Sequence, residues 1–572
     1  MRRLLLFLLL VALPAVNVVS GETRPKAAHD PVVTLLHSEL DRAMTALSKS
    51  DPAPYFLSYS VSDKAQTVMM ASGGAMLTSV SGRRRMLDVS IRVGSAALDN
   101  THDENRASGL SSGTLPLADD ADAIRRTLWL TTDAEYKKAA QAYLKAKTQT
   151  AVRAKAEDDS PDFSVQKPSA HADAPLAPQK TDLKAQEAKL RAVSAEFLKH
   201  RDVYTAAAIL LTQESTRYFV SSEGSELVTR QRLYRVMLLA ETRADDGMEL
   251  MSVETFQSSS LDKLPTEAQL IASAQKLVGD LRQLRTATVA EPYDGPALLS
   301  GRAAAVFFHE VLGHRLEGQR QRGEEEGQTF TKKIGKPVLP DFMDVVDDPL
   351  TAQLGGMELS GSYQFDEEGV PAHRVELIQK GILENFLMSR MPVKNFAESN
   401  GHGRGEEGRM PAGRQGNLIV TSANKVPDAD LRARLIEEAK KQDRPYGLYF
   451  EDIQGGFTLT TRSLPQSFQV LPVKVWRVYT DGRPDELVRG IDIVGTPLTS
   501  LTRIVVTGTQ QSVFNGVCGA ESGQVPVSAV SPAILMSSLE VQKRAKSKER
   551  PPILPPPGFA DEKTPKTGGG GQ

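Results

Sequence analysis

The sequence is poor in cysteine: Cys518 is the single cysteine among 572 residues. One cysteine cannot form a disulfide bond within the chain, so disulfides cannot hold this fold together. Aromatic residues make up only 6% of the sequence, whereas hydrophobic residues make up 40% and charged residues 24%. The last two values are ordinary for a globular protein, so the composition excludes an unfolded or fibrous class.

The sequence also has no excess of positive charge. Its 69 lysines and arginines are balanced by 71 aspartates and glutamates, which gives a formal net charge of −2. Proteins that bind nucleic acid usually present a basic face, so we expect no nucleic-acid partner. We interpret the short charged runs at residues 83–85 and 324–326 as solvated surface.

Long apolar runs are missing except at the very start. Residues 1–3 are basic at two positions, residues 4–16 are almost all apolar, and Val18 and Ser20 are small residues before a cut ahead of Gly21. This pattern predicts a secretory signal peptide at 1–20 and an exported protein, periplasmic or extracellular. A retained anchor is the alternative, but the apolar segment is short for a membrane span. We expect no membrane span in the mature chain.

A length of 572 residues favours two or three domains. We expect an α+β fold, in which a mixed strand and helix domain (21–290) precedes a strand-rich C-terminal domain (291–543) that carries a metal-binding helix. Prolines among polar residues predict a flexible linker or insertion at 157–181. A tail rich in lysine, proline and glycine, 544–572, is expected to be disordered.

Periodicity predicts the main elements within these domains. Apolar residues at helical spacing predict a helix within 21–53, and further helices are predicted at 121–156, 183–199, 266–285 and 428–441. Alternating patterns indicate strands within 54–95, 218–254 and 446–541, and a hairpin at 374–387.

The most informative segment contains His309, Glu310 and His314, on a helix whose apolar face is expected to be buried. On a straight helix, residues five apart point about 140° away from each other. Glu310 and His314 could therefore be a simple surface pair. Gly313 favours another interpretation, because glycine permits a π-type turn or a break that brings the two histidines together.

Two histidines do not complete a catalytic zinc site, which usually has three protein ligands. Many carboxylates and Cys518 are candidates for the third ligand. Glycines at 516 and 519 let backbone approach Cys518 closely, but a free cysteine is also commonly just a small buried residue. Spacing leaves both interpretations open. It also cannot choose among Arg315, Glu317 and Arg320 as partners of the ligands.

The motif, followed by Arg-Leu-Glu-Gly, resembles that of the TldD/PmbA family, metallopeptidases once called modulators of DNA gyrase. Further segments resemble the family in the same order along the chain. They are VVDD (345–348), DEEGVP (366–371), GIL (381–383), RxxN (414–417), YGLY (446–449), GG (455–456), GVCG (516–519) and QVPV (524–527). The resemblance covers about 290–541 and is weak before 290.

This resemblance implies zinc held by His309, His314 and Cys518, with Glu310 as the catalytic residue. Iron(II), which accepts the same ligand types, is the less favoured metal. The chain carries every motif element and so resembles the active TldD type. Family members act on unfolded or flexible peptides inside an enclosed dimer, which implies a homodimer or a heterodimer with a motif-lacking member.

The expected function is therefore an exported zinc-dependent peptidase in which Glu310 is the general base for a metal-activated water. Arg414 is a candidate oxyanion donor, and Asn417, Gly455 and Gly456 are candidates for holding the peptide as an added strand. The alternative for Asn417, Gly455 and Gly456 is that they are ordinary turn residues. The main alternative function is a non-catalytic peptide-binding scaffold or partner subunit; another is hydrolysis of a non-peptide amide.

Overall fold

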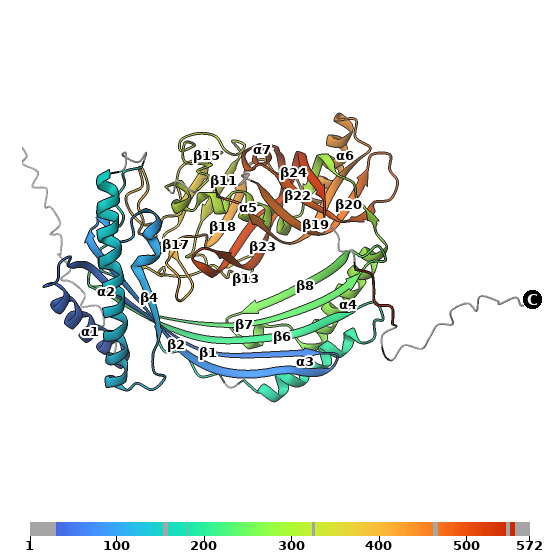
Figure 1. Ribbon diagram of the computed structural model, residues 1–572. Coiled ribbons are helices and arrows are strands. Elements are labelled where there is room, and N and C mark those ends of the chain that lie inside the picture. Colours follow the sequence, from blue (N-terminus) through green and yellow to red (C-terminus); the bar gives the residue numbers. More distant parts are fainter. Residues whose placement is uncertain are drawn as a thin grey trace, which may run out of the picture.

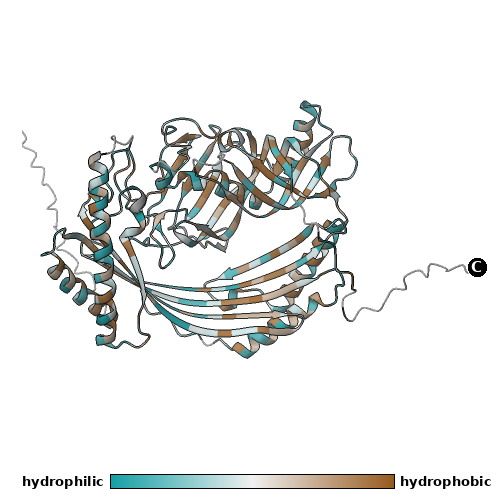
Figure 2. Ribbon diagram, in the orientation of Figure 1, coloured by the Kyte–Doolittle hydropathy of each residue, from teal (hydrophilic) through white to brown (hydrophobic). Residues whose placement is uncertain are grey.

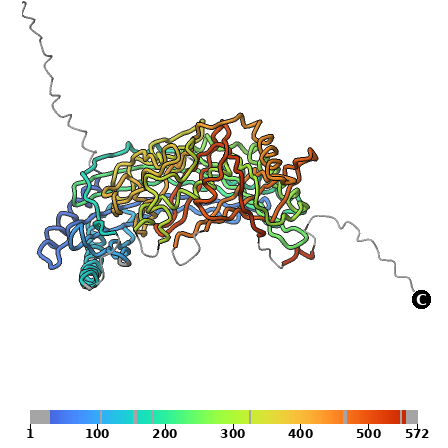
Figure 3. Tube along the Cα trace, turned by 90° about the horizontal axis from the view of Figure 1, so that it is seen from above, coloured from blue at the N-terminus to red at the C-terminus, as the bar shows by residue number. Residues whose placement is uncertain are grey.

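A computed structural model describes residues 30–152, 158–179, 181–322, 326–461, 467–544, 549–554 and 557. The N-terminal half forms a long curved sheet with helices packed against it, and the C-terminal half lies above the concave face of that sheet (Figure 1). Seen from above, the C-terminal strands cover much of the N-terminal sheet (Figure 3). The expected α+β class, with a strand-rich C-terminal domain, is confirmed.

The N-terminal sheet has eight strands within the described residues, in the order β3-β2-β1-β6-β7-β5, with β4 beside β2 and β8 beside β7. Its strands pair antiparallel, except for the parallel pair β5–β7. The strands are β1 (Pro54–Ser72), β2 (Ala75–Ser95), β3 (Leu98–Asp99), β4 (Leu110–Thr114), β5 (Ala170–Ala172), β6 (Thr205–Ser221), β7 (Glu226–Arg243) and β8 (Glu249–Ser258).

Four helices cover this sheet in two pairs, and each pair seals its own apolar core. Teal and brown alternate along the long strands (Figure 2), as expected for strands with one buried face. Leu57, Val89 and Ile91 pack under the first helix pair, and Leu210 and Leu238 pack under the second. The helices are α1 (Pro31–Leu47) and α2 (Ala121–Val152) at one end, and α3 (Leu183–Phe197) and α4 (Glu267–Thr286) at the other.

The helix starts follow from local chemistry. The Asp30 carboxylate accepts a hydrogen bond from the amide of Val32, and Pro31 occupies the first helical turn of α1. At α4, Thr266 and Gln269 form a capping box in which each side chain accepts a hydrogen bond from the other residue's amide. These caps satisfy amides that lack partners inside the helix.

The C-terminal sheet has twelve strands in the described part of the chain, in the order β15-β14-β11-β18-β24-β10-β19-β20-β21-β9, with β22 beside β20 and β24, and β23 beside β24. The strands are β9 (Thr288–Val289), β10 (Tyr293–Leu299), β11 (Met343–Asp347), β14 (Val375–Gln379), β15 (Ile382–Leu383), β18 (Asn417–Ser422), β19 (Tyr446–Thr458), β20 (Phe468–Tyr479), β21 (Glu486–Arg489), β22 (Ile491–Gly495), β23 (Ile504–Ala520) and β24 (Gly523–Lys543).

Shorter elements complete this domain. The helices are α5 (Gly301–Val311), α6 (Leu431–Lys441) and α7 (Pro497–Leu501), and the two small hairpins are β12 (Gln353–Leu354) with β13 (Met357–Glu358) and β16 (Gly403–Arg404) with β17 (Ala412–Gly413). α5 packs against β19, β23 and β24. The central helix of the domain therefore lies beside strands that are distant from it in the sequence.

One strand begins earlier than the sequence pattern predicts. Strands were expected from residue 218, whereas β6 starts at Thr205. Its first residues include three successive alanines, 206–208, and alanine has a low preference for strands. The strand forms because β6 pairs with β1 and β7 along its length, so tertiary pairing overrides local preference.

The described residues of 157–181, a segment predicted as a flexible linker or an insertion, pack against both domains. Phe163 is only 4% exposed, and its ring lies 4.9 Å from the ring of Phe56. The Arg390 guanidinium of the C-terminal domain lies 3.9 Å from the Phe163 ring centroid, and Ala170 pairs with β7. The Phe163 ring, backbone hydrogen bonds and the pairing with β7 thus hold a segment whose composition looks solvated.

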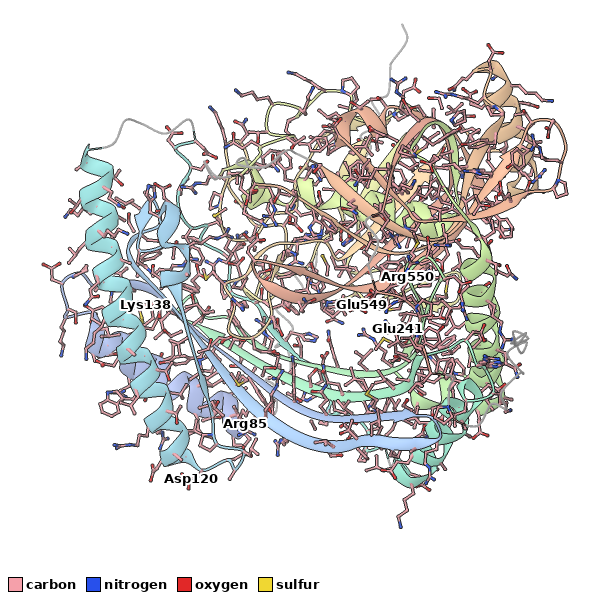
Figure 4. All side chains as sticks on the ribbon, turned by 45° about the vertical axis from the view of Figure 1, so that its right-hand side comes forward. Arg85, Asp120, Lys138, Glu241, Glu549 and Arg550 are labelled. Carbon is pink, nitrogen blue, oxygen red and sulfur yellow. The ribbon has the colours of Figure 1, made fainter. Side chains whose placement is uncertain are left out.

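The predicted disordered tail also makes contacts where it is described. The Arg544 amide donates a hydrogen bond to Gly490 O, and Glu549 forms an ion pair with Arg243 at 2.9 Å. Arg550 donates to Asp245 O at 2.9 Å. Figure 4 shows Glu549 and Arg550 beside Glu241, at the end of the N-terminal sheet. The rest of the tail lies outside the described residues.

The predicted signal peptide, 1–20, lies outside the described residues as well. No helix in the described ranges is both long and apolar enough to cross a membrane.

The ordered 158–179 segment gives a first prediction. Phe163→Ala should remove a buried ring, cost about 3 kcal/mol and lower the midpoint of thermal unfolding measured by calorimetry. Val165→Ala, at a side chain that is 70% exposed in the same segment, is the matched control and should leave the midpoint nearly unchanged. Equal midpoints for the two variants would show that the segment is a linker after all.

Candidate metal centre

Helix α5 carries the first motif histidine through the centre of the domain. Every residue from Ala303 to Val311 is buried, and Ser300 caps the helix by accepting a hydrogen bond from the Ala303 amide at 3.1 Å. His309 and Glu310 are therefore presented from a helix that is enclosed by protein. The expectation of a buried helix face is confirmed and extends to nearly the whole helix.

The helix breaks between the two histidines. α5 ends at Val311, Leu312 departs from helical geometry with φ −110° and ψ −56°, and Gly313–Leu316 forms a 3₁₀ turn. This break brings the ring centroids of His309 and His314 to 4.9 Å. Of the two devices that the glycine permitted, the chain uses the break and not the π-type turn.

Gly313 is required by a neighbour. A Cβ atom at this position would lie 2.0 Å from the Gln415 side-chain oxygen. The Gln415 amide nitrogen in turn donates a hydrogen bond to the His309 carbonyl at 3.3 Å. Only a residue without a side chain lets Gln415 reach the end of the helix, so Gly313 admits the residue that holds His309 in place.

Three ligand-type atoms converge at this break. Cys518 Sγ lies 3.3 Å from His309 Nε2 and 3.2 Å from His314 Nε2, and all three atoms lie within 4.8 Å of one another. The three side chains are buried. Cys518 belongs to β23, where it pairs with Val525 of β24. The sheet therefore closes a gap of more than two hundred residues in sequence.

Glu317 fixes the orientation of His314. His314 Nδ1 lies 2.9 Å from Glu317 Oε1. Burial raises the pKa of Glu317, but His314 and Arg320 lower it more, to about 2, so the carboxylate is ionised and can only accept. Nδ1 therefore donates the hydrogen bond, and Nε2 faces Cys518; its lone pair is available to a metal when the ring is neutral.

The charges of the three residues depend on one another. Burial raises the pKa of the Cys518 thiol, but His314 and His309 outweigh it and hold the pKa well below its usual value. Burial lowers the pKa of His309 and His314, but Cys518 outweighs it and raises both. Without a metal, the thiolate is thus balanced by imidazolium; a bound cation would take the place of the two protons.

The residues present fit a zinc ion. Imidazole nitrogen and thiolate sulfur are zinc ligands, at about 2.1 Å and 2.3 Å, and three protein ligands leave a fourth position open. Nitrogen–sulfur separations of 3.2–3.3 Å are compatible with two ligands on one such ion. Iron(II) accepts the same donors, so metal analysis has to distinguish the two.

Glu310 lies beside this cluster without joining it. Its Oε2 is 3.9 Å from His314 Nε2, beyond hydrogen-bond distance, and the residue is 7% exposed. Burial raises the pKa of Glu310, with His309 and His314 acting in the opposite direction. The alternative of a surface Glu310–His314 pair is therefore wrong, because both side chains are buried.

A cavity of about 380 Å³ adjoins these four residues. Residues of β19 form one wall, and residues of β23 with the turn after it form the other; they include Gln454, Gly455, Gly456, Phe457, Thr458, Phe514, Val517, Gly519 and Glu521. Phe457 and Val517 are 48% and 45% exposed. The buried ligand cluster therefore has access to an opening with apolar side chains at its rim.

The two glycines of β19 differ in their surroundings. A Cβ at Gly456 would lie 2.7 Å from Glu310 Cγ, whereas a Cβ at Gly455 would meet nothing within 4 Å. Arg315 fixes this end of the strand, because its guanidinium donates to Thr458 Oγ1 and to Leu459 O. Gly456 thus brings the backbone of β19 into contact with Glu310. A site in which a peptide backbone has to reach Glu310 requires this close approach.

Arg414 and Asn417 do not line the cavity, and the expectation that they hold substrate is corrected. Both are fully buried. Arg414 donates to Cys518 O at 2.8 Å and to Ser522 Oγ at 2.8 Å. Asn417 donates to Asp348 O at 3.0 Å and to two further acceptors. Their hydrogen bonds all go to protein atoms, and Arg414 Nε lies in ion-pair contact with Glu317 Oε1 at 3.3 Å, so both residues stabilise the fold around the site.

Sequence reasoning missed Gln415 and could not choose among the partners of the histidines. Gln415 carries no motif signal of its own, and its role follows only from its contact with Gly313. Of the three candidate partners, Glu317 contacts His314 directly, Arg320 contacts Glu317, and Arg315 binds β19. The spacing i, i+3 from His314 to Glu317 is compatible with this contact but is too common to select it.

Residues 292–543 match the family model described as the PmbA/TldA metallopeptidase C-terminal domain. A metalloprotease of Methanothermobacter thermautotrophicus is 25% identical over 336 residues, 58% of this chain and 68% of the relative. A metalloprotease TldD homolog of Haemophilus influenzae is 28% identical over 251 residues, 43% of this chain and 48% of the relative. This chain thus spans only about half the length of the second relative.

Solved structures share the fold of nearly the whole chain. TldE from Thermococcus kodakarensis superposes with a TM-score of 0.57 at 12% identity, covering 90% of this chain and 100% of that one. A putative modulator of DNA gyrase from Thermotoga maritima gives 0.57 at 13% identity, covering 88% and 100%. At such identities the likeness concerns the fold alone. The sequence matches carry the more specific similarity: residues 292–543 are similar to the PmbA/TldA metallopeptidase C-terminal domain.

Proposed function

We propose that the protein is an exported zinc-dependent peptidase of the TldD/PmbA family, which hydrolyses peptide bonds in unfolded or flexible peptides. One observation carries the proposal. Three ligand atoms from His309, His314 and Cys518 converge within 4.8 Å, and the Glu310 carboxylate lies beside them at the wall of a cavity. A zinc metalloprotease TldD homolog of Saccharolobus solfataricus, 24% identical over 326 residues, supports the choice of metal.

Zinc, when bound here, would polarise a peptide carbonyl and lower the pKa of a coordinated water. The protein's own contribution is proton transfer and positioning. Glu310 is buried, and its carboxylate makes no hydrogen bond to His314 at 3.9 Å, so its oxygens remain available. It accepts the proton of the attacking water and passes it to the leaving amine nitrogen.

The edge of β19 is the proposed binding strand for the peptide. β19 pairs with β10 only from Leu448 to Phe450, so beyond Phe450 that edge has no strand partner among the described residues. An unpaired edge offers amides and carbonyls to an extended peptide. Gly456 places this backbone against Glu310, which would bring a bound peptide bond to the general base. An enclosed site of this kind favours flexible chains over folded ones.

A non-catalytic peptide-binding scaffold or partner subunit is the alternative function. Such a protein could keep the β19 edge but has no need for a thiolate, two imidazoles and a free carboxylate in one buried cluster. Hydrolysis of a non-peptide amide would use the same chemistry at a different substrate. Digestion of model peptides against non-peptide amides distinguishes these functions.

The oligomeric state and the compartment of the protein are part of the proposed function. We propose a dimer, either with a second copy or with a motif-lacking family member; the resemblance to the family and the shared fold with a protein titled TldE support it. The basic and apolar start of the sequence supports export to the periplasm or the exterior. Light scattering of the mature protein tests the first point, and fractionation of expressing cells tests the second.

Removing a ligand should remove the metal. We expect about one zinc per chain by atomic absorption, and loss of most of it in His314→Ala and in Cys518→Ala. Full metal content and full activity in Cys518→Ser would show that another residue is the third ligand. Iron in place of zinc in the purified wild type would contradict the assigned metal.

Removing the general base should separate binding from chemistry. Glu310→Gln keeps the size of the side chain but cannot accept a proton, so metal content should stay and peptide turnover should fall by about 10²–10⁴-fold. Glu437→Gln, in an exposed pair with Arg434 on helix α6, is the control and should cleave at the wild-type rate. Wild-type cleavage by Glu310→Gln would end the proposed mechanism.

Filling the space beside Glu310 should have a similar but smaller effect. In Gly456→Ala, the new Cβ has to displace either Glu310 or the Gln469 carbonyl, which lies 2.9 Å away. Misplacing a catalytic group by an ångström costs up to about 100-fold, so we expect a loss of that order with metal retained. Gly82→Ala, a strand glycine with open space around it, should leave turnover unchanged. Equal rates for the two variants would argue against contact between β19 and the general base.

A further inference from the structure

The two segments that carry the metal ligands are joined by a buried pair of charged side chains. His309 and His314 come from α5 and the turn after it, and Cys518 comes from β23. Between them lie Glu317 and Arg414, both fully buried, with Arg414 Nε 3.3 Å from Glu317 Oε1. Neither side chain belongs to the ligand set of His309, His314 and Cys518, so metal coordination does not account for the pair.

We propose that Glu317 and Arg414 form a positioning pair, which orients His314 and holds it in register with Cys518 for a metal ion; this inference deepens the proposed peptidase function and rests on its metal site. The pair connects the ligands by a short chain of contacts. His314 Nδ1 lies 2.9 Å from Glu317, Glu317 meets Arg414, and Arg414 donates to the Cys518 carbonyl at 2.8 Å.

Contacts to both oxygens of the Glu317 carboxylate fix its orientation. Its Oε1 faces His314 and Arg414, and its Oε2 accepts hydrogen bonds from Arg320 Nε and Nη2 at 3.2 and 3.1 Å. Two guanidinium groups therefore hold the carboxylate in place while it receives the imidazole proton. An ionised carboxylate at Nδ1 selects the tautomer with a free Nε2 lone pair, which is the form that binds a metal.

Arg414 is held just as firmly. Its backbone amide donates to His402 O at 3.0 Å, and the following residues are fixed by Asp347, which accepts hydrogen bonds from the amides of Gly416 and Asn417. Besides Cys518 O, the guanidinium donates to Ser522 Oγ and Gly523 O in the turn after β23. Arg414 thus links a rigid backbone segment to β23, the strand that carries Cys518.

The two histidines are not held equally. His309 Nδ1 has no hydrogen-bond partner in the part of the chain that is described, and this residue is held through its backbone by helix packing and by Gln415. The orientation of His314, on a short 3₁₀ turn, depends on its side chain contact with Glu317. Loss of the pair should therefore disturb one ligand and leave the other in place.

A purely structural buried ion pair is the competing explanation, and the N-terminal domain supplies a matched control. Arg85 and Asp63 form a buried pair at 2.7 Å, with side chains 2% and 8% exposed, in a sheet that contributes no metal ligand. Asp63→Asn removes a buried carboxylate charge of the same kind. If the pair is only structural, Glu317→Gln and Asp63→Asn should both lower stability without a specific loss of zinc affinity. If the pair positions the ligand, only Glu317→Gln should weaken zinc binding.

The experiment measures zinc affinity of the full-length mature protein by competition with a chromophoric chelator, together with the thermal midpoint of each metal-free protein. Glu317→Gln should weaken zinc binding by about 10–100-fold, the usual effect of losing the partner of a ligating histidine. Arg414→Lys, which keeps the charge but loses the planar fork, should weaken it less. Asp63→Asn should bind zinc as the wild type does.

A spectroscopic readout keeps the test independent of activity. With cobalt(II) in place of zinc, the visible absorption bands of Glu317→Gln should differ from those of the wild type, whereas Asp63→Asn should reproduce them. Wild-type zinc affinity in both Glu317→Gln and Arg414→Lys would overturn the positioning role, as would equal weakening in Asp63→Asn. If Glu317→Gln does not fold, Arg414→Lys and Asp63→Asn decide by the same comparison.

Failure of this inference is distinguishable from failure of the proposed function. Suppose that the wild type binds zinc and that the variants rank in affinity as expected, but that the wild type cleaves no peptide. This result would end the peptidase proposal and support the role of the pair. A wild type that cleaves peptides while Glu317→Gln and Arg414→Lys keep full affinity would overturn the pair and leave the peptidase standing. Absence of zinc binding by the wild type would overturn both.

Discussion

The structure depends on the burial of one thiolate between two imidazoles. A charge removed from water costs several kcal/mol unless it is paired, and Cys518 is paired by His309 and His314 at 3.2–3.3 Å. His314 in turn needs an acceptor, which Glu317 supplies, and Glu317 needs the guanidinium groups of its neighbours. Each buried charge therefore requires the next, and the requirement extends from α5 through its terminal turn to β23 and the segment after β17.

The N-terminal domain connects to this network through directed contacts. Arg217 of β6 donates to the backbone carbonyls of Asp366 and Glu367, so main-chain geometry on one side fixes a side chain on the other. Glu407, at the tip between β16 and β17, accepts a hydrogen bond from Ser62 of β1 at 2.8 Å. The base of that hairpin leads directly to Arg414.

Local patterns predicted the elements well, because helix and strand periodicity reflects which face of each element is buried. They also singled out His309, Glu310 and His314, since two of only nine histidines lie five residues apart in this segment. They could not choose between a break and a π-type turn, because that choice follows from Gln415, which is distant in sequence. They offered Arg414 as an oxyanion donor, whereas its partners within the protein come from a turn over a hundred residues away. Positions whose role depends on a distant partner carry no local signal.

The two glycines at the site show the same limit from another direction. A motif glycine is usually explained by backbone freedom, but neither Gly313 nor Gly456 has a positive φ. Each is required because a side chain from elsewhere occupies the space where its own would be: Gln415 at one position and Glu310 at the other. The ligand turn and the catalytic carboxylate therefore pack against bare backbone. Because contact with backbone has no rotamer to relax, this packing holds both groups more rigidly than contact between side chains would.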